Sequence, residues 1–204
     1  MTESIPRLIL ASASHARSAM LQAAGLCFDI IASDLDEDAI KSLAGDPASD
    51  IEAGDVALLL AQTKAVTVSQ RIPDALVIGA DQTLLLGERL LDKPATIEAA
   101  REQLLLLRGH THMLDTAVAC AMAGKVIWTA SERAHLTLRN FSPEALGRYL
   151  AATGHDVTAS VGGYKIEGPA IQLFARIEGD YFAILGLPLL ALLQFLRDKG
   201  VIVA

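Results

Sequence analysis

A continuous apolar run in the middle of the chain, residues 75–80 (ALVIGA), constrains the fold more than any other segment. The run has no polar face, so a strand formed here must be covered on both sides, as the central strands of α/β sheets are. Asp81 follows directly. A carboxylate at the C-terminal end of such a strand lies where α/β proteins place their binding sites. The alternative interpretation is that Asp81 only caps a turn.

The rest of the chain alternates helical and extended patterns. Strands are predicted at residues 7–11 and 28–32, in a hairpin at 83–86 and 89–91, and as two long strands at 110–122 and 125–140. Helices are predicted at about 15–24, 55–70, 96–108, 143–154 and 188–199. Residues 40–52 are predicted to be a loop, and 160–180 form a glycine-rich segment. This mixture predicts an α/β protein in which a sheet forms one wall of a cleft.

Length and composition favour one globular domain over residues 1–204, with room for two lobes. Half of the residues are hydrophobic and only 4% are aromatic, so the core must be aliphatic. The formal net charge of −7 disfavours nonspecific binding to nucleic acid or to anionic membranes. No basic signal-peptide start and no apolar stretch long enough to span a bilayer are present, so we expect a cytoplasmic protein.

Cysteines and histidines give no metal-binding spacing. Cys27 and Cys120 lie far apart in apolar surroundings and are predicted to be reduced core thiols. His110 and His112 alternate on a predicted strand and should face the same side. With no third ligand near them in the sequence, we do not predict a metal site there.

A serine-rich turn after the first predicted strand could bind an anion. Ser12, Ser14 and Arg17 surround the start of a predicted helix, where unpaired N–H groups and the helix dipole favour phosphate oxygens. An arginine on the first turn adds further donors. The alternative is an ordinary helix cap beside a surface arginine. The turn is not a P-loop, because the G-x-x-x-x-G-K-[ST] pattern does not occur.

Two further charged residues could complete such a site. Glu37 lies in the acidic run 34–38, and together with Asp81 it could hold Mg²⁺ and activate water. Lys93 follows the predicted hairpin and could return beside Asp81. The alternatives are a solvated acidic surface and an ordinary loop lysine.

Six segments in order resemble the Maf family of nucleoside triphosphate pyrophosphatases. They are LILASASHAR, DLDE, VIGADQ, LDKP, GGYKIEG and IEGDYFAILGLPL, and they extend over nearly the whole chain. The resemblance implies a Maf/ITPase-like fold, with a mixed, strongly curved sheet, flanking helices and two lobes around a nucleotide cleft. It also implies a possible homodimer and hydrolysis of nucleotides to nucleoside monophosphate and pyrophosphate, with Mg²⁺ or Mn²⁺ as cofactor.

The resemblance also implies roles for individual residues. Ser12, Ser14 and Arg17 would bind phosphate, and Asp81 would accept the proton and, with Glu37, hold the metal. The two lysines would neutralise charge on the phosphates; they are Lys64, in AQTKA, and Lys93, in LDKP.

Three positions would set the choice of base: Ala16, Gln82 and Glu167. Gln and Glu at the last two positions resemble relatives that act on 7-methyl-GTP rather than on dTTP or UTP, and a carboxylate can accept hydrogen bonds from N1–H and the amine of guanine. Ala16 departs from the family pattern, in which a larger side chain is usual. Ser160 also departs, since relatives have lysine or cysteine there.

Three other functions fit parts of the sequence. A metal-dependent phosphatase would use the same residues but release phosphate, and a non-catalytic regulator of septum formation would bind nucleotides without hydrolysing them. A dinucleotide-dependent oxidoreductase is disfavoured, because no G-x-G-x-x-G follows the first predicted strand.

Overall fold

The computed structural model describes residues 6–43 and 51–203. The chain divides into two compact units. The first unit comprises Met1–Gln82, Thr116–Glu132 and Asp180–Ala204, and the second comprises Thr83–Asp115 and Arg133–Gly179.

The strands belong to one mixed sheet with the order β2-β1-β3-β5-β6-β7, and β4 pairs with β3. They are β1 (Leu8–Leu10), β2 (Asp29–Ile30), β3 (Leu76–Leu86), β4 (Arg89–Leu91), β5 (Thr111–Met122), β6 (Lys125–Leu138) and β7 (Phe174–Glu178). In the first unit β1 pairs in parallel with β2 and β3. In the second unit β3 pairs with β4 and β6 with β7, both antiparallel. The predicted mixed α/β fold is confirmed.

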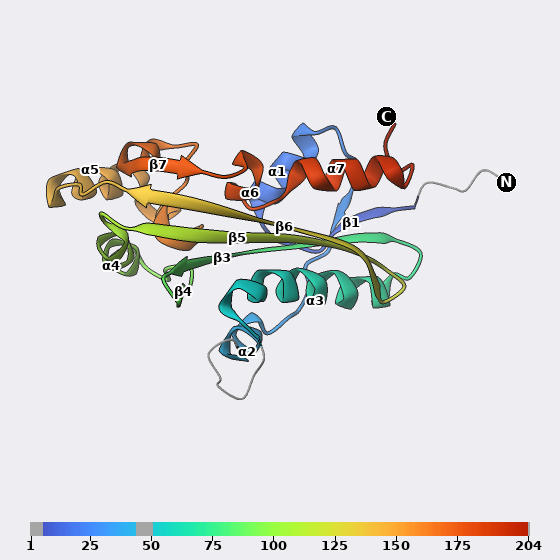
Figure 1. Ribbon diagram of the computed structural model, residues 1–204. Coiled ribbons are helices and arrows are strands. Elements are labelled where there is room, and N and C mark those ends of the chain that lie inside the picture. The colour runs from blue at the N-terminus through green and yellow to red at the C-terminus, as the bar shows by residue number, and fades with distance from the viewer. Residues whose placement is uncertain (1–5, 44–50, 204) are drawn as a thin grey trace. The chain divides into compact units, whose positions relative to one another are not determined.

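Helices cover both faces of the sheet in the first unit (Figure 1). Helices α1 (His15–Ala23) and α7 (Leu189–Asp198) lie on one face, and α3 (Val56–Arg71) lies on the other. Alternate residues of β3 enter two separate cores. Ile78 packs in the core that includes Leu192, and Val77 packs in the core that includes Ala61. This confirms the predicted strand buried on both faces, which begins at Leu76 rather than at Ala75.

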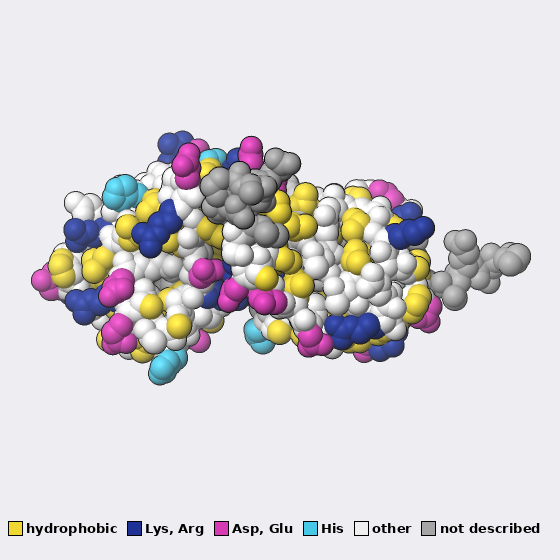
Figure 2. Space-filling model, turned by 90° about the horizontal axis from the view of Figure 1, so that it is seen from below, with side chains coloured by type: hydrophobic (Ala, Val, Ile, Leu, Met, Phe, Trp, Pro, Cys, Tyr) yellow, Lys and Arg dark blue, Asp and Glu magenta, His cyan; other side chains and the backbone are white. Residues whose placement is uncertain are grey.

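Helix α3 lies unusually close to β3 at Gly79. A Cβ atom at this position would lie 2.1 Å from the carbonyl oxygen of Ala61 and 2.7 Å from the amide nitrogen of Ala65. Only glycine permits this approach, which fixes the middle of α3 against the strand. Figure 2 shows that the outward side chains of α3 are mainly uncharged.

Three shorter helices complete the first unit. They are α2 (Glu37–Leu43), the 3-10 turn Ala53–Asp55 and α6 (Tyr181–Ile184). The second unit carries α4 (Ile97–Leu107), α5 (Pro143–Thr153) and the 3-10 turns Gly154–Thr158, Val161–Gly163 and Pro169–Leu173. Among the described residues, none of the helices has the length and apolar character that crossing a membrane requires.

A buried His–Tyr pair lies in the core of the second unit. The Nε2 atom of His112 is 2.6 Å from the hydroxyl of Tyr164, whose ring packs edge-on against Phe174. The Nδ1 atom of His112 has no hydrogen-bond partner among the described residues. Burial lowers the pKa of His112 from 6.5 to about 4, because a charged imidazolium would lose its hydration.

We expect this histidine to make stability depend on pH. Since the pKa of His112 is lower in the folded than in the unfolded state, the unfolded chain binds more protons between about pH 6.5 and pH 4. The neutral His112 side chain therefore contributes about 3 kcal/mol to the free energy of unfolding above pH 6.5, and this contribution is lost as the pH falls to 4. Denaturant titrations at pH 7, 5.5 and 4 measure it. His112→Gln should flatten the curve, whereas the exposed His155→Gln should not, and equal curves for both variants would contradict this assignment.

Several predicted elements differ from the structure. Residues 40–43, predicted as loop, belong to α2, where Asp36 accepts a hydrogen bond from the Ala39 amide and acidic residues begin the helix. Residues 44–50 lie outside the described residues. The glycine-rich segment contains two 3-10 turns and β7, because its glycines permit tight turns between short elements.

Three side-chain predictions were wrong in part. Asp81 lies within β3 rather than at its end, because antiparallel pairing with β4 extends the strand to Leu86. Both cysteines are free, but Cys27 is exposed and only Cys120 is buried. His110 precedes β5 and is exposed, whereas His112 is buried, so the two histidines do not share an environment.

Candidate active site

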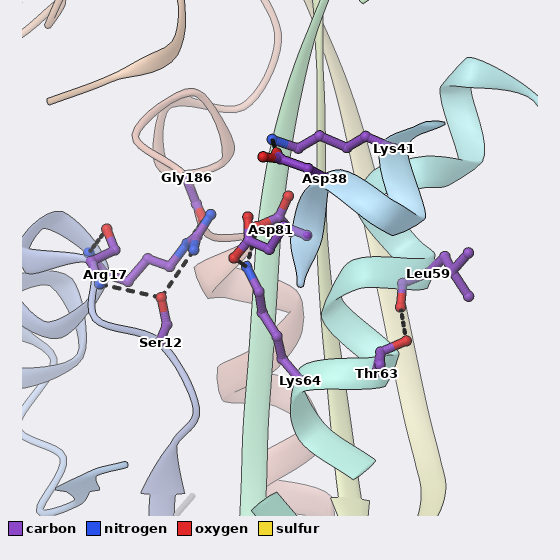
Figure 3. Close-up of polar contacts among 11 residues, drawn as sticks. Ser12, Arg17, Asp38, Lys41, Leu59, Thr63, Lys64, Asp81 and Gly186 are labelled. Carbon is purple, nitrogen blue, oxygen red and sulfur yellow. Dashed lines mark hydrogen bonds and ion pairs between the residues drawn. The ribbon is translucent and has the colours of Figure 1, made fainter. Parts of the chain in front are cut away.

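The centre of the candidate site is a lysine held between two carboxylates. Figure 3 shows Lys64 beside one of them, Asp81. The ammonium of Lys64 lies 2.5 Å from Asp81 Oδ1 and 2.7 Å from Glu37 Oε1. The three residues come from α3, β3 and the first turn of α2. Segments that are distant in sequence are therefore joined by one cation in the first unit.

Packing explains why a lysine can occupy this position. The Lys64 side chain is only 7% exposed, and that of Asp81 is 9% exposed, so each charge needs the other. Lys64 lies within the stretch of α3, from Ala61 to Ala65, that contacts Gly79. Gly79 is two residues before Asp81 on β3. The close approach of helix and strand therefore positions the ion pair.

The serine-rich turn follows β1 and leads into α1. Ser14 is the N-cap of α1, as predicted, with its side chain accepting a hydrogen bond from the Arg17 amide. The Arg17 guanidinium donates to Ser12 Oγ through Nη1 at 3.0 Å. It also donates to the carbonyl oxygen of Gly186 through Nε at 2.8 Å. These contacts fix the guanidinium over the turn (Figure 3).

Arg17 is buried and shares the electrostatic field of the two carboxylates. Burial lowers the pKa of Arg17, and the charges of Asp81 and then Glu37 act in the opposite direction. An arginine keeps its charge at neutral pH under such conditions. Formally, the two cations Arg17 and Lys64 balance the two carboxylates, so this cluster is neutral without a ligand.

Gln82 points to the other side of β3 from Asp81, as alternation along a strand requires. Its amide nitrogen donates to Thr116 Oγ1 at 2.9 Å and to the carbonyl oxygens of Ala183 at 2.9 Å and Ile184 at 3.1 Å. The carbonyl groups that bind Gln82, at residues 183 and 184, lie two residues before Gly186, whose carbonyl binds Arg17.

The carboxylates are the candidate ligands for a divalent cation. Within the described residues, no group of three or more His, Cys, Asp or Glu side chains is arranged to hold a metal ion. Asp81 and Glu37 nevertheless direct oxygen atoms at one ammonium group. Carboxylate oxygens in this arrangement suit a hard cation such as Mg²⁺, with water or substrate completing its coordination.

The structure brings some, but not all, of the predicted site residues together. The structure brings together Ser12, Ser14, Arg17, Glu37, Lys64 and Asp81 in the first unit. Ala16 is half-buried on the first turn of α1. Lys93 and Glu167 are exposed residues of the second unit. In that unit, Ser160 donates a hydrogen bond to the carbonyl oxygen of Tyr164 at 2.6 Å.

Sequence reasoning did not identify two contributors, Thr116 and Gly186. Gly186 contributes a backbone carbonyl, and its φ of +112° is a conformation that side chains rarely adopt. The glycine in the sequence could have predicted such a turn, but nothing in the sequence indicated that its carbonyl would bind Arg17. Thr116 occupies a strand interior and resembles any other buried β-branched residue in sequence.

Comparisons with known proteins identify relatives along nearly the whole chain. The family model described as Maf-like protein matches residues 7–199. A 7-methyl-GTP pyrophosphatase from Mesorhizobium japonicum is 50% identical over 202 residues, which cover 99% of each chain. A nucleoside triphosphate pyrophosphatase from Granulibacter bethesdensis is 49% identical over 94% of this chain and 96% of its own. One from Rhodospirillum rubrum is 45% identical over the full length of both.

The match of the family model therefore covers almost all of the chain, including every residue that the structure gathers around Lys64. Relatives of nearly equal length align from end to end at 45–50% identity. On these grounds, the chain belongs to the Maf-like protein family.

Proposed function

We propose that this protein hydrolyses nucleoside triphosphates to nucleoside monophosphate and pyrophosphate. The observation that carries the proposal is the convergence of Asp81 and Glu37 on Lys64 in one buried cluster that also includes the charge of Arg17. Hydrolysis of a phosphoric anhydride needs carboxylates to activate water and cations to offset charge on the phosphates. The names of the three relatives described above, each a pyrophosphatase, support this reaction.

The triphosphate would bind at the serine-rich turn. The N-terminus of α1 offers amide groups and a favourable dipole, and Ser12 and Ser14 add hydroxyls. Arg17 is already oriented by Ser12 and Gly186, so little freedom remains to be lost when a phosphate binds. In the second unit, Lys93 would add a further positive charge to the phosphates.

Asp81 would accept the proton of the attacking water, and Glu37 would help to orient that water. Lys64 pairs with Asp81 in a buried environment and would stabilise charge that develops on the phosphates. Pyrophosphate leaves as the water oxygen bonds to the α-phosphorus. No covalent intermediate with the protein is needed.

A divalent cation, Mg²⁺ or Mn²⁺, fits the donor set of Asp81 and Glu37. When bound, it would polarise phosphoryl oxygens and offset their charge. The charge balance supports a need for this cation, because the positive charges of Arg17 and Lys64 are already matched by the two carboxylates. A triphosphate therefore needs positive charge beyond what this cluster supplies.

The proposal includes a choice of base. Gln82 and Glu167 lead us to propose guanine-type bases, including 7-methylguanine, as preferred substrates over thymine and uracil. The name of the Mesorhizobium japonicum relative supports this preference. Assembly as a homodimer and a cytoplasmic location are also part of the proposal.

An assay of the purified protein against a nucleotide panel tests this function. The common NTPs and dNTPs and 7-methyl-GTP would be supplied with Mg²⁺ or Mn²⁺, and pyrophosphate and phosphate would be measured separately. We expect pyrophosphate from guanine-type nucleotides, and loss of turnover when EDTA removes the metal. Release of phosphate alone would indicate a phosphatase. No release from any nucleotide, with binding retained, would favour the non-catalytic regulator.

A further inference from the structure

Carbonyl groups at the end of the short helix α6 accept hydrogen bonds from side chains of other elements, and that of Ala183 also accepts one from the Gly186 amide at 2.8 Å. The helix has only four residues, and Asp180 caps its start by accepting a hydrogen bond from the Ala183 amide. Helix C-termini leave their last carbonyls without helical partners. Here Gln82 Nε2 donates to the carbonyl oxygens of Ala183 and Ile184, and Thr116 Oγ1 also donates to that of Ala183 at 2.9 Å.

These contacts decide which way the Gln82 amide points. Carbonyl oxygens can only accept hydrogen bonds, so the NH₂ end of Gln82 must face them and the carbonyl end must face away. The hydroxyl of Thr116 gives its own proton to Ala183 and can therefore accept from Gln82 Nε2. The donors of Gln82 are thus engaged by three acceptors.

The remaining atom of the amide, Oε1, is an acceptor without a partner. It receives no hydrogen bond from the part of the chain that the structure describes, and it is not among the atoms sealed from solvent. Gln82 directly follows Asp81, and it is tied to the same Ala183–Gly186 segment as Arg17. One short segment therefore orients both the Arg17 guanidinium and the Gln82 amide.

We propose that Thr116 is a positioning residue that, with the α6 carbonyls, makes Gln82 present only its acceptor Oε1, so that the site selects bases carrying a ring N–H. Guanine, hypoxanthine and uracil have such a donor, whereas adenine and cytosine have an acceptor nitrogen at the equivalent ring position. An acceptor facing an acceptor is penalised, because neither atom regains the hydrogen bond it had to water. This inference rests on the proposed function and adds a selection against adenine and cytosine, which is separate from the proposed preference for guanine over thymine and uracil.

Two purine substrates, compared in the unmodified protein and in Gln82→Leu, test this interaction. Inosine triphosphate has the N1–H donor and a 6-oxo group, purine riboside triphosphate has an acceptor at N1 and no 6-oxo group, and neither has an exocyclic amine. The part of their ratio that Gln82→Leu removes is the part that depends on the Gln82 acceptor. For the unmodified protein we expect kcat/KM to favour inosine triphosphate by about tenfold or more. Gln82→Leu should reduce the ratio to within about threefold, mainly through KM for inosine triphosphate, since a leucine cannot accept a hydrogen bond.

Variants at Thr116 test the positioning role. Thr116→Val has a similar shape but no hydroxyl, so the amide should be held less firmly and the ratio should fall to a value between those of the parent and Gln82→Leu. Thr116→Ser retains the hydroxyl and should restore the parental ratio. The ratio compares two substrates on one protein, so a general loss of stability or of active enzyme does not change it.

The outcomes separate this inference from the proposed function. Hydrolysis of both nucleotides with equal kcat/KM by the unmodified protein would overturn base selection through Gln82 and leave the pyrophosphatase intact. A parental ratio in Thr116→Val would overturn the role of Thr116. Absence of pyrophosphate from both substrates, and from the wider panel, would overturn the proposed function and this inference with it.

Discussion

Replacing Asp81 by Asn should leave the protein folded and lower kcat for pyrophosphate release by about 10²- to 10⁴-fold, the range typical for loss of a general base. The side-chain amide has the shape of the carboxylate, and its oxygen can still accept a hydrogen bond from Lys64. It cannot take a proton from water or offer a negative charge to a metal ion. Steady-state kinetics with the best substrate of the panel, together with a thermal melt, measure both parts of the expectation.

Asp74→Asn is the matched control for this variant. Asp74 is an exposed residue of the same unit, so the same chemical change there should leave kcat unaltered. If Asp81→Asn retained parental turnover, Asp81 would not be the proton acceptor. A cooperative melt near the parental temperature is needed to assign a lost activity to chemistry rather than to folding.

Gly79→Ala should destabilise the protein strongly, although it adds a single methyl group. The new Cβ would meet backbone atoms of α3 at 2.1 and 2.7 Å, so the helix must move away from β3. Overpacking of this kind costs about 3 kcal/mol, which corresponds to a fall in Tm of roughly 10 °C for a chain of this size. Activity should fall as well, because Lys64 moves with α3.

Gly147→Ala provides a control with the opposite sign. Gly147 lies inside α5, and a Cβ there would have no atom within 4 Å. Alanine should therefore raise the free energy of unfolding by about 0.5–1 kcal/mol through helix propensity. Melts of the two variants distinguish the close contact at Gly79 from a general effect of replacing glycine. Equal Tm values for Gly79→Ala and the parent would contradict the close approach of α3.

Local patterns in the sequence predicted the parts of the fold that depend on neighbouring residues. The apolar run at 75–80 required a strand covered on both faces, and Ser14 provided the cap of α1. Where local signals conflicted, prediction failed. Residues 40–43 were predicted as loop, but the structure places them in α2, whose first turn carries Glu37 and Asp38, and carboxylates at a helix start stabilise its dipole.

The order of motifs along the chain determined the family and the chemical types of the site residues. What only the tertiary structure decided is how those residues meet. Lys64 binds both Asp81 and Glu37 because a glycine lets α3 approach β3, and Arg17 and Gln82 are oriented by carbonyl oxygens of residues 183–186. Every residue has a backbone carbonyl, so such a partner leaves no mark in the sequence. Its availability depends on where a helix ends in space.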